Sequence, residues 1–297
     1  MPGSVEEIAA LFARCGAEGY GVALVGPRFA RRSARRRPVL VDLRRLDAVE
    51  HIDEVSRVVR AQAGITLAGL ERELRARGLT LGPVAARHPA LPVGELLQCP
   101  DAADRSPRYG RPTDACLGLH AMRADGTVLH WRDAPRKAAG PDWRALVLGA
   151  RGEGAVLTAV TLRVYGLPEV VREAAYRFAS RAAALRACRE AVRREVRPAT
   201  WWCTTTLAAR LEGPRTIVAA EEQALRDAAR AEGGRPAEPT ARPIRPAAHL
   251  RWSELLRRGG AVSEMTLDGG CLHGRAAPEA ELPGRITHAV DPKGVLC

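Results

Sequence analysis

The sequence predicts an α+β fold built from two units, on three grounds. Short apolar runs that fit buried strands alternate along the chain with segments whose apolar residues recur at helical spacing. The 297 residues exceed the size of one average domain. With 46% hydrophobic and 27% charged residues, the composition is that of a globular protein and excludes the intrinsically disordered class.

Arginine carries almost all of the positive charge. The chain has 46 Lys+Arg against 34 Asp+Glu, a net charge of +12, yet its only lysines are Lys137 and Lys293 and it contains no asparagine. This bias is typical of GC-rich coding rather than of a basic binding surface, and 4% aromatic residues are few for a surface that stacks on bases. We therefore expect no nucleic-acid partner, although the charge alone keeps a basic nucleic-acid-binding protein open as an alternative.

The sequence also bears on location and on metals. It contains no run of about 18 apolar residues, so we expect no membrane span, and its first ten residues lack the layout of a signal peptide. His120 and His130 flank a predicted hairpin without further ligands, so we expect no metal site. An odd, dispersed set of cysteines without a CxxC pair indicates reduced, buried thiols in a cytoplasmic protein. These are Cys15, Cys99, Cys116, Cys188, Cys203, Cys271 and Cys297.

The first elements follow from capping residues and apolar runs. Ser4 and Glu7 form a capping box before a predicted helix at about 5–16. Short strands are predicted at 22–25 and 39–41. Between them Gly26-Pro27 opens an arginine-rich loop, placed where a phosphate-binding loop would lie. Its arginines are Arg28, Arg31, Arg32, Arg35, Arg36 and Arg37.

The middle of the chain is predicted to form further strands around one helix. Alternation over 55–59 favours a strand, and Thr66 caps a helix that carries leucines at positions 67, 70 and 74 and ends at Gly78. Residues 79–118 form a proline-rich stretch without regular structure, typical of functional or cofactor-lining segments. A hairpin with Asp125-Gly126 at its tip follows, and then a short helix at 146–148 and a strand at 155–164.

The remainder predicts a second α+β unit. Strands at 174–178, 200–206 and 216–220 and helices at 185–196 and 221–231 give the order β-α-β-β-α, which is most of a ferredoxin-like module. Trp201-Trp202 is expected to pack its core. A proline-rich linker and a helix around 247–258 follow, and the last forty residues are rich in glycine and proline.

An ordered set of short motifs runs through residues 38–166. Taken together and at their separations, they resemble the flavin-binding domain of the vanillyl-alcohol-oxidase (PCMH-type) family of FAD-linked oxidoreductases. Pro135-Arg136 and 140–142 are similar to the alkyl-glycerone-phosphate-synthase branch, whereas the chain length and 291–294 are similar to the glycolate-oxidase FAD subunit. The motifs are 39–46, 63–67, Leu70-Glu71, Leu74, Gly78-Leu79, Gly94, Tyr109-Gly110, Asp114, 124–126, 140–142, Leu146, Gly149, Gly152 and 158–162.

The resemblance implies a domain organisation and a cofactor. Residues 1–168 would form a two-subdomain PCMH-type FAD-binding domain, 169–262 a shortened ferredoxin-like substrate cap, and 263–297 a segment that returns to the flavin domain. FAD would be held largely by backbone amides, because pyrophosphate needs several N–H donors at close approach.

Three segments map onto the family's flavin contacts. They are Gly26, Pro27, Arg28, Phe29 and Ala30 for the pyrophosphate loop; Pro92, Val93, Gly94 and Glu95 for a second turn; and Gly152, Gly154, Ala155, Val156 and Leu157 for a third. The residues depart from the family pattern at three points. Pro27 removes an N–H donor from the first loop, Glu95 stands where the family has a second glycine, and Arg151 replaces an acidic residue.

Two residues are candidates for catalysis under this resemblance. His273 lies between glycines and suits a general base near neutral pH. Arg136 matches an arginine of the synthase branch, and a guanidinium can clamp a carboxylate or phosphate. The resemblance implies oxidation of a hydroxyl-bearing, anionic, 2-hydroxy-acid-like small molecule with hydride transfer to the flavin, and a possible electron-transfer or catalytic partner subunit.

A second interpretation follows from the three departures from the family pattern. The flavin loops would have degenerated, and the chain would be a non-catalytic subunit or pseudo-enzyme that retains the scaffold for protein–protein contact. The sequence leaves both readings open.

Overall fold

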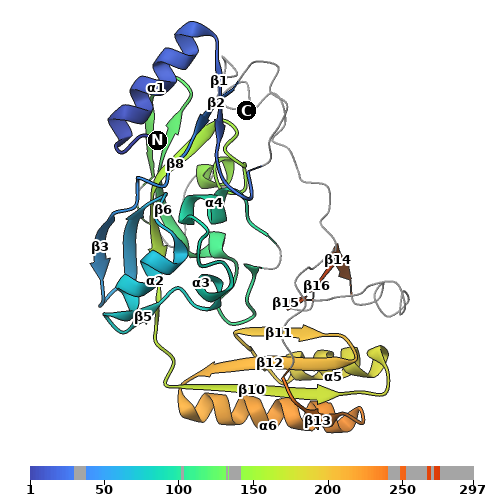
Figure 1. Ribbon diagram of the computed structural model, residues 1–297. Helices are drawn as coiled ribbons and strands as arrows, with labels where there is room; N and C mark the ends of the chain where they lie inside the picture. Colours follow the sequence, from blue (N-terminus) through green and yellow to red (C-terminus); the bar gives the residue numbers. More distant parts are fainter. Residues whose placement is uncertain are drawn as a thin grey trace. The chain divides into compact units, whose positions relative to one another are not determined.

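The computed structural model divides the chain into two units (Figure 1). It describes residues 1–29, 38–101, 104–131, 133, 142–239, 248–251, 266–268 and 271–274, with side chains up to residue 239 except that of Trp143. Unit 1 contains Met1–Asp101 and Pro112–Gly166, and unit 2 contains Ala102–Arg111 and Leu167–Glu279. Helices and strands mix within each unit, which confirms the predicted α+β class.

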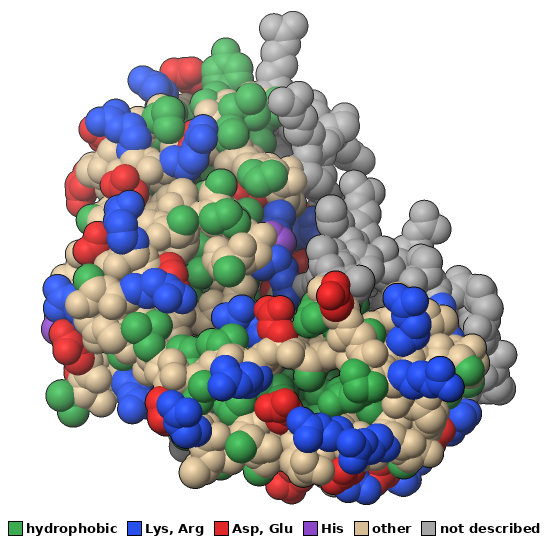
Figure 2. All heavy atoms as spheres, turned by 60° about the horizontal axis from the view of Figure 1, so that its bottom comes forward, with side chains coloured by type: hydrophobic (Ala, Val, Ile, Leu, Met, Phe, Trp, Pro, Cys, Tyr) green, Lys and Arg blue, Asp and Glu red, His purple; other side chains and the backbone are tan. Residues whose placement is uncertain are grey.

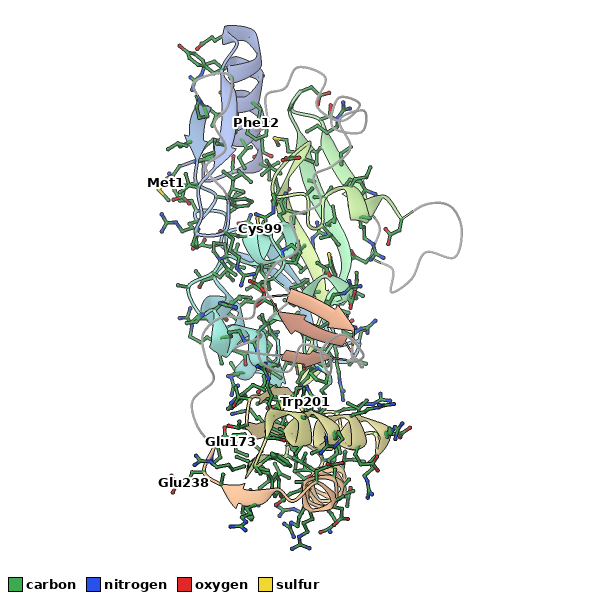
Figure 3. The ribbon with its side chains drawn as sticks, turned by 90° about the vertical axis from the view of Figure 1, so that its right-hand side faces the viewer. Met1, Phe12, Cys99, Glu173, Trp201 and Glu238 are labelled. Atoms are coloured by element: carbon green, nitrogen blue, oxygen red, sulfur yellow. The ribbon has the colours of Figure 1, made fainter. Side chains whose placement is uncertain are left out.

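The N-terminal layer of unit 1 is one helix on two strands. Helix α1 (Val5–Glu18) begins at Ser4, whose hydroxyl accepts the Glu7 N–H at 3.2 Å, and ends at Gly19 in the left-handed region. Strands β1 (Gly21–Leu24) and β2 (Pro38–Val41) pair in parallel. Phe12, labelled in Figure 3, is fully buried between α1 and these strands with Val22 and Met122.

A five-stranded antiparallel sheet forms the centre of unit 1. Its order is β3-β4-β8-β6-β7. The strands are β3 (Val49–Asp53), β4 (Val58–Gln62), β6 (Cys116–Arg123), β7 (Val128–Trp131) and β8 (Ala155–Arg163). The hairpin between β6 and β7 turns at Gly126 with φ +82°, as the Asp-Gly pair predicts.

The strand predicted over 55–59 is partly wrong. Residues 54–57 turn instead, because the Asp53 carboxylate accepts the N–H groups of Val55 at 3.0 Å and Ser56 at 2.8 Å. Arg57 completes the turn at φ +54°, and β4 starts at the next residue. An Asx-type turn therefore forms at residues 54–57, where the alternation of side chains predicts a strand.

Short elements fill the rest of unit 1. Helix α2 (Leu67–Arg75) begins at Thr66, whose hydroxyl accepts the Gly69 N–H, as predicted. The stretch expected to lack regular structure contains short elements: β5 (Leu79–Thr80), which pairs with β9 (Tyr165–Gly166), the helices α3 (Pro83–Arg87) and α4 (Val93–Gln98), and the 3-10 turn η2 (Pro112–Ala115). A second 3-10 turn, η3 (Trp143–Leu146), begins at Asp142.

Unit 2 is a four-stranded antiparallel sheet with two helices. Its order is β11-β12-β10-β13. The elements are β10 (Val170–Arg177), α5 (Arg181–Arg193), β11 (Thr200–Cys203), β12 (Thr206–Gly213), α6 (Arg215–Ala231) and β13 (Arg235–Ala237). Alternate strand residues such as Tyr176 and Leu211 pack with both helices, and Trp201, labelled in Figure 3, is buried in this core as predicted.

Two predictions in unit 2 are wrong. Residues 216–220, predicted as a strand, form the first turns of α6, because Val218 continues the buried helical face of Leu225. A helix was predicted at 247–258, yet β14 (Ala248–Arg251) pairs there with β16 (Cys271–Gly274), which also pairs with β15 (Thr266–Asp268). Pairing with a strand distant in sequence therefore overrides the helical spacing of apolar residues at 248–251. Residues 252–258 lie outside the described part of the chain.

The segment before η2 belongs to unit 2, which the sequence did not predict. The Ser106 hydroxyl donates to the Ala199 carbonyl at 2.6 Å, and the Tyr109 hydroxyl donates to Glu212 on β12 at 2.6 Å. Arg108 pairs with the largely buried Glu221 at 3.2 Å. Tyr109 therefore contributes to the structure of unit 2.

The burial of the cysteines and the mixture of surface charges are those of an ordinary globular protein. Five cysteines within the part whose side chains are described are buried: Cys15, Cys99, Cys116, Cys188 and Cys203. On the face drawn in Figure 2, basic side chains lie interspersed with acidic and apolar ones. Among the described helices, none combines the length and the apolar character that a bilayer crossing requires.

One glycine of unit 1 is required by close packing. A Cβ added at Gly64 would overlap the carbonyl oxygen of Leu43, whereas one at Gly166 would meet only the Arg57 guanidinium at 4.0 Å. We predict that Gly64→Ala lowers the free energy of unfolding by about 3 kcal/mol, at the upper end of the cost of overpacking. Gly166→Ala, the matched control, should stay within about 0.5 kcal/mol. Urea unfolding followed by circular dichroism measures both, and equal effects would contradict the close packing at Gly64.

Candidate functional site

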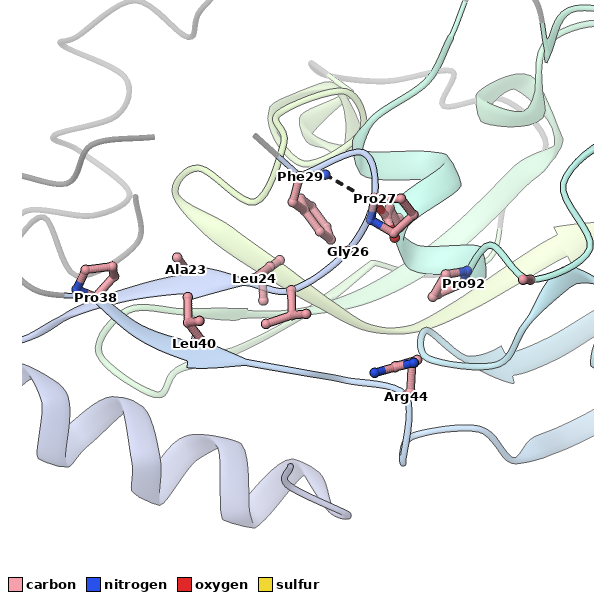
Figure 4. Close-up of a pocket in the computed structure, with 12 residues that line it drawn as sticks. Ala23, Leu24, Gly26, Pro27, Phe29, Pro38, Leu40, Arg44 and Pro92 are labelled. Carbon is pink, nitrogen blue, oxygen red and sulfur yellow. Dashed lines mark hydrogen bonds between the residues drawn. The ribbon is translucent and has the colours of Figure 1, made fainter. Parts of the chain in front are cut away.

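A cavity of about 600 Å³ opens in unit 1 beside the end of β1 (Figure 4). One wall is the strand end and the loop after it, a second is the start of β2, and a third comes from the segment that leads into α4. Arg44 lies at its edge. The lining residues are Ala23, Leu24, Val25, Gly26, Pro27, Phe29, Pro38, Leu40, Arg44, Ala90, Pro92 and Glu95.

The loop after β1 wraps around a carboxylate. The Val25 N–H donates to the Val41 carbonyl at 2.9 Å, which extends the β1–β2 pairing by one residue. The backbone N–H groups of Arg28 and Phe29 then both donate to Oε1 of Glu95. The hydrogen bond from Phe29 is 3.2 Å long and is drawn as a dashed line in Figure 4. Successive N–H groups that converge on one point form an anion-binding nest. In this chain the anion in the nest is the side chain of Glu95.

Glu95 is enclosed by the protein. Its exposed fraction is 2%, and its second oxygen, Oε2, is buried and has no hydrogen-bond partner. Burial raises the pKa of Glu95, while the N–H donors of Arg28 and Phe29 and the charge of Arg28 act in the opposite direction. A Cβ at Gly26 would overlap this carboxylate, so the glycine leaves the space that Glu95 fills.

Helix α4 holds Glu95 in place through its neighbours. All six of its residues are buried. The N–H of Gly94 donates to the Ala63 carbonyl at 2.7 Å, and a Cβ at Gly94 would lie 2.8 Å from that of Ala63. At the other end, the Gln98 amide donates to the Ala155 carbonyl at 2.9 Å and accepts the Leu157 N–H at 3.3 Å. The helix is therefore fixed to the first residues of β8.

The third predicted segment forms a tight turn against the first loop. Gly152 and Gly154 adopt φ +83° and +78°, and Arg151 between Ala150 and Gly152 adopts φ +55°. The Arg151 N–H donates to the Gln98 carbonyl at 2.9 Å, which joins this turn to α4. A Cβ at Gly152 would lie 2.9 Å from Leu24 Cδ1 and 3.7 Å from the Phe29 ring. The structure thus places the three predicted segments next to one another.

The predicted residues differ in what they offer to a ligand. Gly26, Pro27, Phe29, Pro92 and Glu95 line the cavity. By contrast, the side chains of Val93, Val156 and Leu157 are fully buried in the core, and Ala155 is nearly so, which leaves only backbone groups for contact. Arg28 donates from Nη1 to the Cys99 carbonyl at 3.2 Å, across the end of α4.

Arg44 is a cavity residue that the sequence analysis did not place in the site. It lies in the quoted motif 39–46, but a motif position alone gave no signal that the side chain faces the cavity. Its guanidinium pairs with Asp42 at 2.5 Å, and the hydrogen bond from Arg44 lowers the pKa of Asp42. The pair has no net charge, because the Asp42 carboxylate compensates the Arg44 guanidinium.

Several other predicted residues are placed only in part. Ala30 and Arg136 lie outside the described residues. His273 lies on β16, opposite His249 and Thr266 in the strand register, but its side chain is not described. His120 and His130 stack edge-on with ring centres 4.1 Å apart, and His120 contacts Arg60. Among the side chains that are described, no group of three His, Cys, Asp or Glu is arranged to hold a metal ion.

Comparison with known proteins relates the N-terminal part of the chain to flavoproteins. Residues 1–132 match the family model of the FAD binding domain. The match covers less than half of the 297 residues and therefore describes the N-terminal part alone. The uncharacterized FAD-linked oxidoreductase YgcU of Escherichia coli K12 is 34% identical over 127 residues, which are 43% of this chain and 26% of that protein.

Two further comparisons extend the likeness. A probable mitochondrial D-lactate dehydrogenase of Danio rerio is 31% identical over 196 residues, which are 61% of this chain and 37% of that protein. The structure of p-cresol methylhydroxylase with substrate bound superimposes with a TM-score of 0.72 over 92% of this chain and 72% of the other, at 14% identity, so the shared property is the fold. The chain spans about a quarter to two fifths of the length of these two sequence relatives.

The fold of unit 1 is compatible with FAD, whereas the loop after β1 is not. The fold and the match of residues 1–132 are those of an FAD-binding domain. The loop predicted to hold pyrophosphate does not fit it as it stands, because the Arg28 and Phe29 N–H groups bind Glu95, Pro27 has no N–H, and a second anion there would face the carboxylate. The departure noted in the sequence at Glu95 is therefore a structural contact.

The raised pKa of Glu95 gives a prediction about stability. A carboxyl whose pKa is higher in the folded than in the unfolded state contributes stability that is complete below about pH 4.3, the ordinary glutamate value, and is lost as the pH rises through the folded pKa. Glu95→Gln removes this titration and retains an acceptor for both N–H groups. We expect the variant to gain stability relative to the native chain between pH 4 and pH 8.

Urea unfolding midpoints across this range measure the difference. Glu73→Gln on α2, where the carboxyl is half exposed, is the matched control and should show a much smaller change. A difference between Glu95→Gln and the native chain that stays constant with pH would contradict a desolvated carboxyl at this position.

Proposed function

We propose that this chain is an FAD-dependent oxidoreductase that acts on a hydroxyl-bearing, anionic small molecule of the 2-hydroxy-acid type. The observations that carry the proposal are the match of residues 1–132 to an FAD binding domain and the cavity lined by the loop after β1 and by the segment that leads into α4. A flavin supplies redox chemistry when it is bound. The contribution of the chain is to hold and enclose the reactants.

The substrate class is argued from relatives and charge. The D-lactate dehydrogenase relative is named for a 2-hydroxy acid, and its similarity to this chain extends over 196 residues. An anionic substrate suits a chain with a net charge of +12. We further propose that His273 acts as general base, that Arg136 binds the substrate anion, and that a partner subunit accepts electrons or completes the catalytic assembly. A cytoplasmic location remains part of the proposal.

One observation favours a different function. If Glu95 keeps the first loop permanently filled, the chain is a non-catalytic subunit that retains the fold for contact with other proteins. Removal of an N–H donor at Pro27 acts in the same direction. This alternative differs from the first proposal in one measurable property, the binding of FAD.

The test is flavin binding by the purified full chain. We expect equilibrium dialysis against FAD to leave flavin absorbance with the protein. In the presence of an artificial electron acceptor, a panel of D- and L-2-hydroxy acids should then contain a substrate that reduces the acceptor. A protein that stays colourless after incubation with excess FAD would exclude the oxidoreductase and support the non-catalytic subunit.

Substitutions test the two proposed catalytic roles. His273→Ala should lower kcat by about 100-fold or more, as loss of a general base does, without loss of bound flavin. Arg136→Ala should mainly raise KM for the anionic substrate, because an ionic contact of about 2 kcal/mol is lost. His51→Ala on β3 and Arg72→Ala on α2 are exposed controls and should leave both constants unchanged. Unchanged kinetics for His273→Ala or Arg136→Ala would reject the role assigned to that residue.

A further inference from the structure

The nest after β1 has the geometry of an anion site, and the chain itself fills it. The two donors, Arg28 N–H and Phe29 N–H, converge on the single oxygen Oε1 of Glu95. We propose that the Glu95 carboxylate is an internal anion that occupies the pyrophosphate position of this domain and competes with FAD for the loop. This inference rests on the proposed function, because it assumes that FAD is the ligand of the domain.

The contacts of Glu95 are incomplete for a purely structural carboxylate. Buried charged groups are ordinarily paired and have their hydrogen-bonding capacity filled. Glu95 uses one oxygen for both N–H donors, and Oε2 is enclosed without a partner. The same side chain forms part of the wall of the cavity. A carboxylate held by one oxygen at the edge of a cavity can be displaced by an anion that satisfies the donors more fully.

The charged groups around Glu95 determine how a pyrophosphate can bind at the nest. The described cations near the loop are Arg28, which donates to the Cys99 carbonyl, and Arg44, which is paired with Asp42. Burial raises the pKa of Glu95, while the N–H groups of Arg28 and Phe29 and the charge of Arg28 lower it. A pyrophosphate that enters must therefore replace the carboxylate at the two N–H groups or lie beside it at a cost in repulsion.

Gly26 and helix α4 together explain why a side chain of the protein itself fills the nest. A Cβ on residue 26 would overlap the Glu95 carboxylate, so Gly26 makes room for this side chain as well as it would for a phosphate. Because Gly94 packs against Ala63 and Gln98 bonds to β8, α4 cannot move away without loss of these contacts. Release of the nest therefore requires rotation of the Glu95 side chain into the cavity rather than a shift of the helix.

The experiment compares FAD affinity in four versions of the full chain: native, Glu95→Ala, Glu95→Gln and Glu73→Ala. Glu73→Ala is the matched control, since it removes the same charge from a half-exposed position on α2. Isothermal titration with FAD gives Kd for each protein, and thermal melting establishes that each is folded. Amide hydrogen exchange, followed by mass spectrometry of peptides over residues 24–29, reports on the two N–H groups without any ligand.

We expect Glu95→Ala to bind FAD at least about tenfold more tightly than the native chain, since it vacates two N–H donors and removes a facing charge. Glu95→Gln should give an intermediate gain because its amide still accepts both N–H groups, and Glu73→Ala should match the native chain. The amides of residues 28 and 29 should exchange slowly in the native chain and in Glu95→Gln, and faster in Glu95→Ala. If Glu95→Ala does not fold, the FAD affinity of Glu95→Gln relative to the native chain tests the competition.

Three results would count against the proposals, and they differ. Equal FAD affinity in the native chain and in the folded Glu95 variants would overturn the competition while leaving the proposed function intact. Equally fast exchange of the 28 and 29 amides in the native chain and in Glu95→Ala would overturn the internal contact itself. Absence of FAD binding in all four proteins would instead exclude the proposed function, together with the competition that depends on it.

Discussion

A carboxylate removed from water must find donors inside the protein, and in unit 1 the Glu95 side chain finds them in the backbone of the loop after β1. The conformation of that loop, the shape of the adjoining cavity and the absence of a side chain at Gly26 all depend on this contact. Helix α4 positions the carboxylate because its other end is fixed to β8 through Gln98. Three segments that are distant in sequence thus meet at one buried charge.

The contact explains how one chain can have a flavin-binding fold and an altered phosphate loop. Helix α4 and the strands β3, β4, β6 and β7 lie within residues 1–132, which match the FAD binding domain. These elements depend on apolar packing around Leu157 and Leu119, which does not involve the loop. Loop residues can therefore change without loss of this apolar core.

Much of unit 1 could be predicted from the sequence, because its signals are local. Ser4, Thr66 and Asp125-Gly126 each specify a cap or turn through contacts within a few residues, and the structure has them where they were expected. The short helix α4 could not be predicted, since its six buried residues depend on contacts with Ala63 and β8. The strand at Ala248–Arg251 was missed for the same reason, because its partner lies more than twenty residues away. The Glu95 departure was visible in the sequence, but its acceptor role was not, since the donors are backbone groups.

The space at Gly26 also constrains how this protein can change over generations. With Glu95 present, a side chain at residue 26 would displace the Glu95 carboxylate from its place beside the loop, because an added Cβ would overlap its oxygens. A smaller residue at position 95 removes this overlap and leaves a glycine that tolerates either arrangement. The two positions are therefore coupled, since the cost of a substitution at residue 26 depends on which residue stands at position 95.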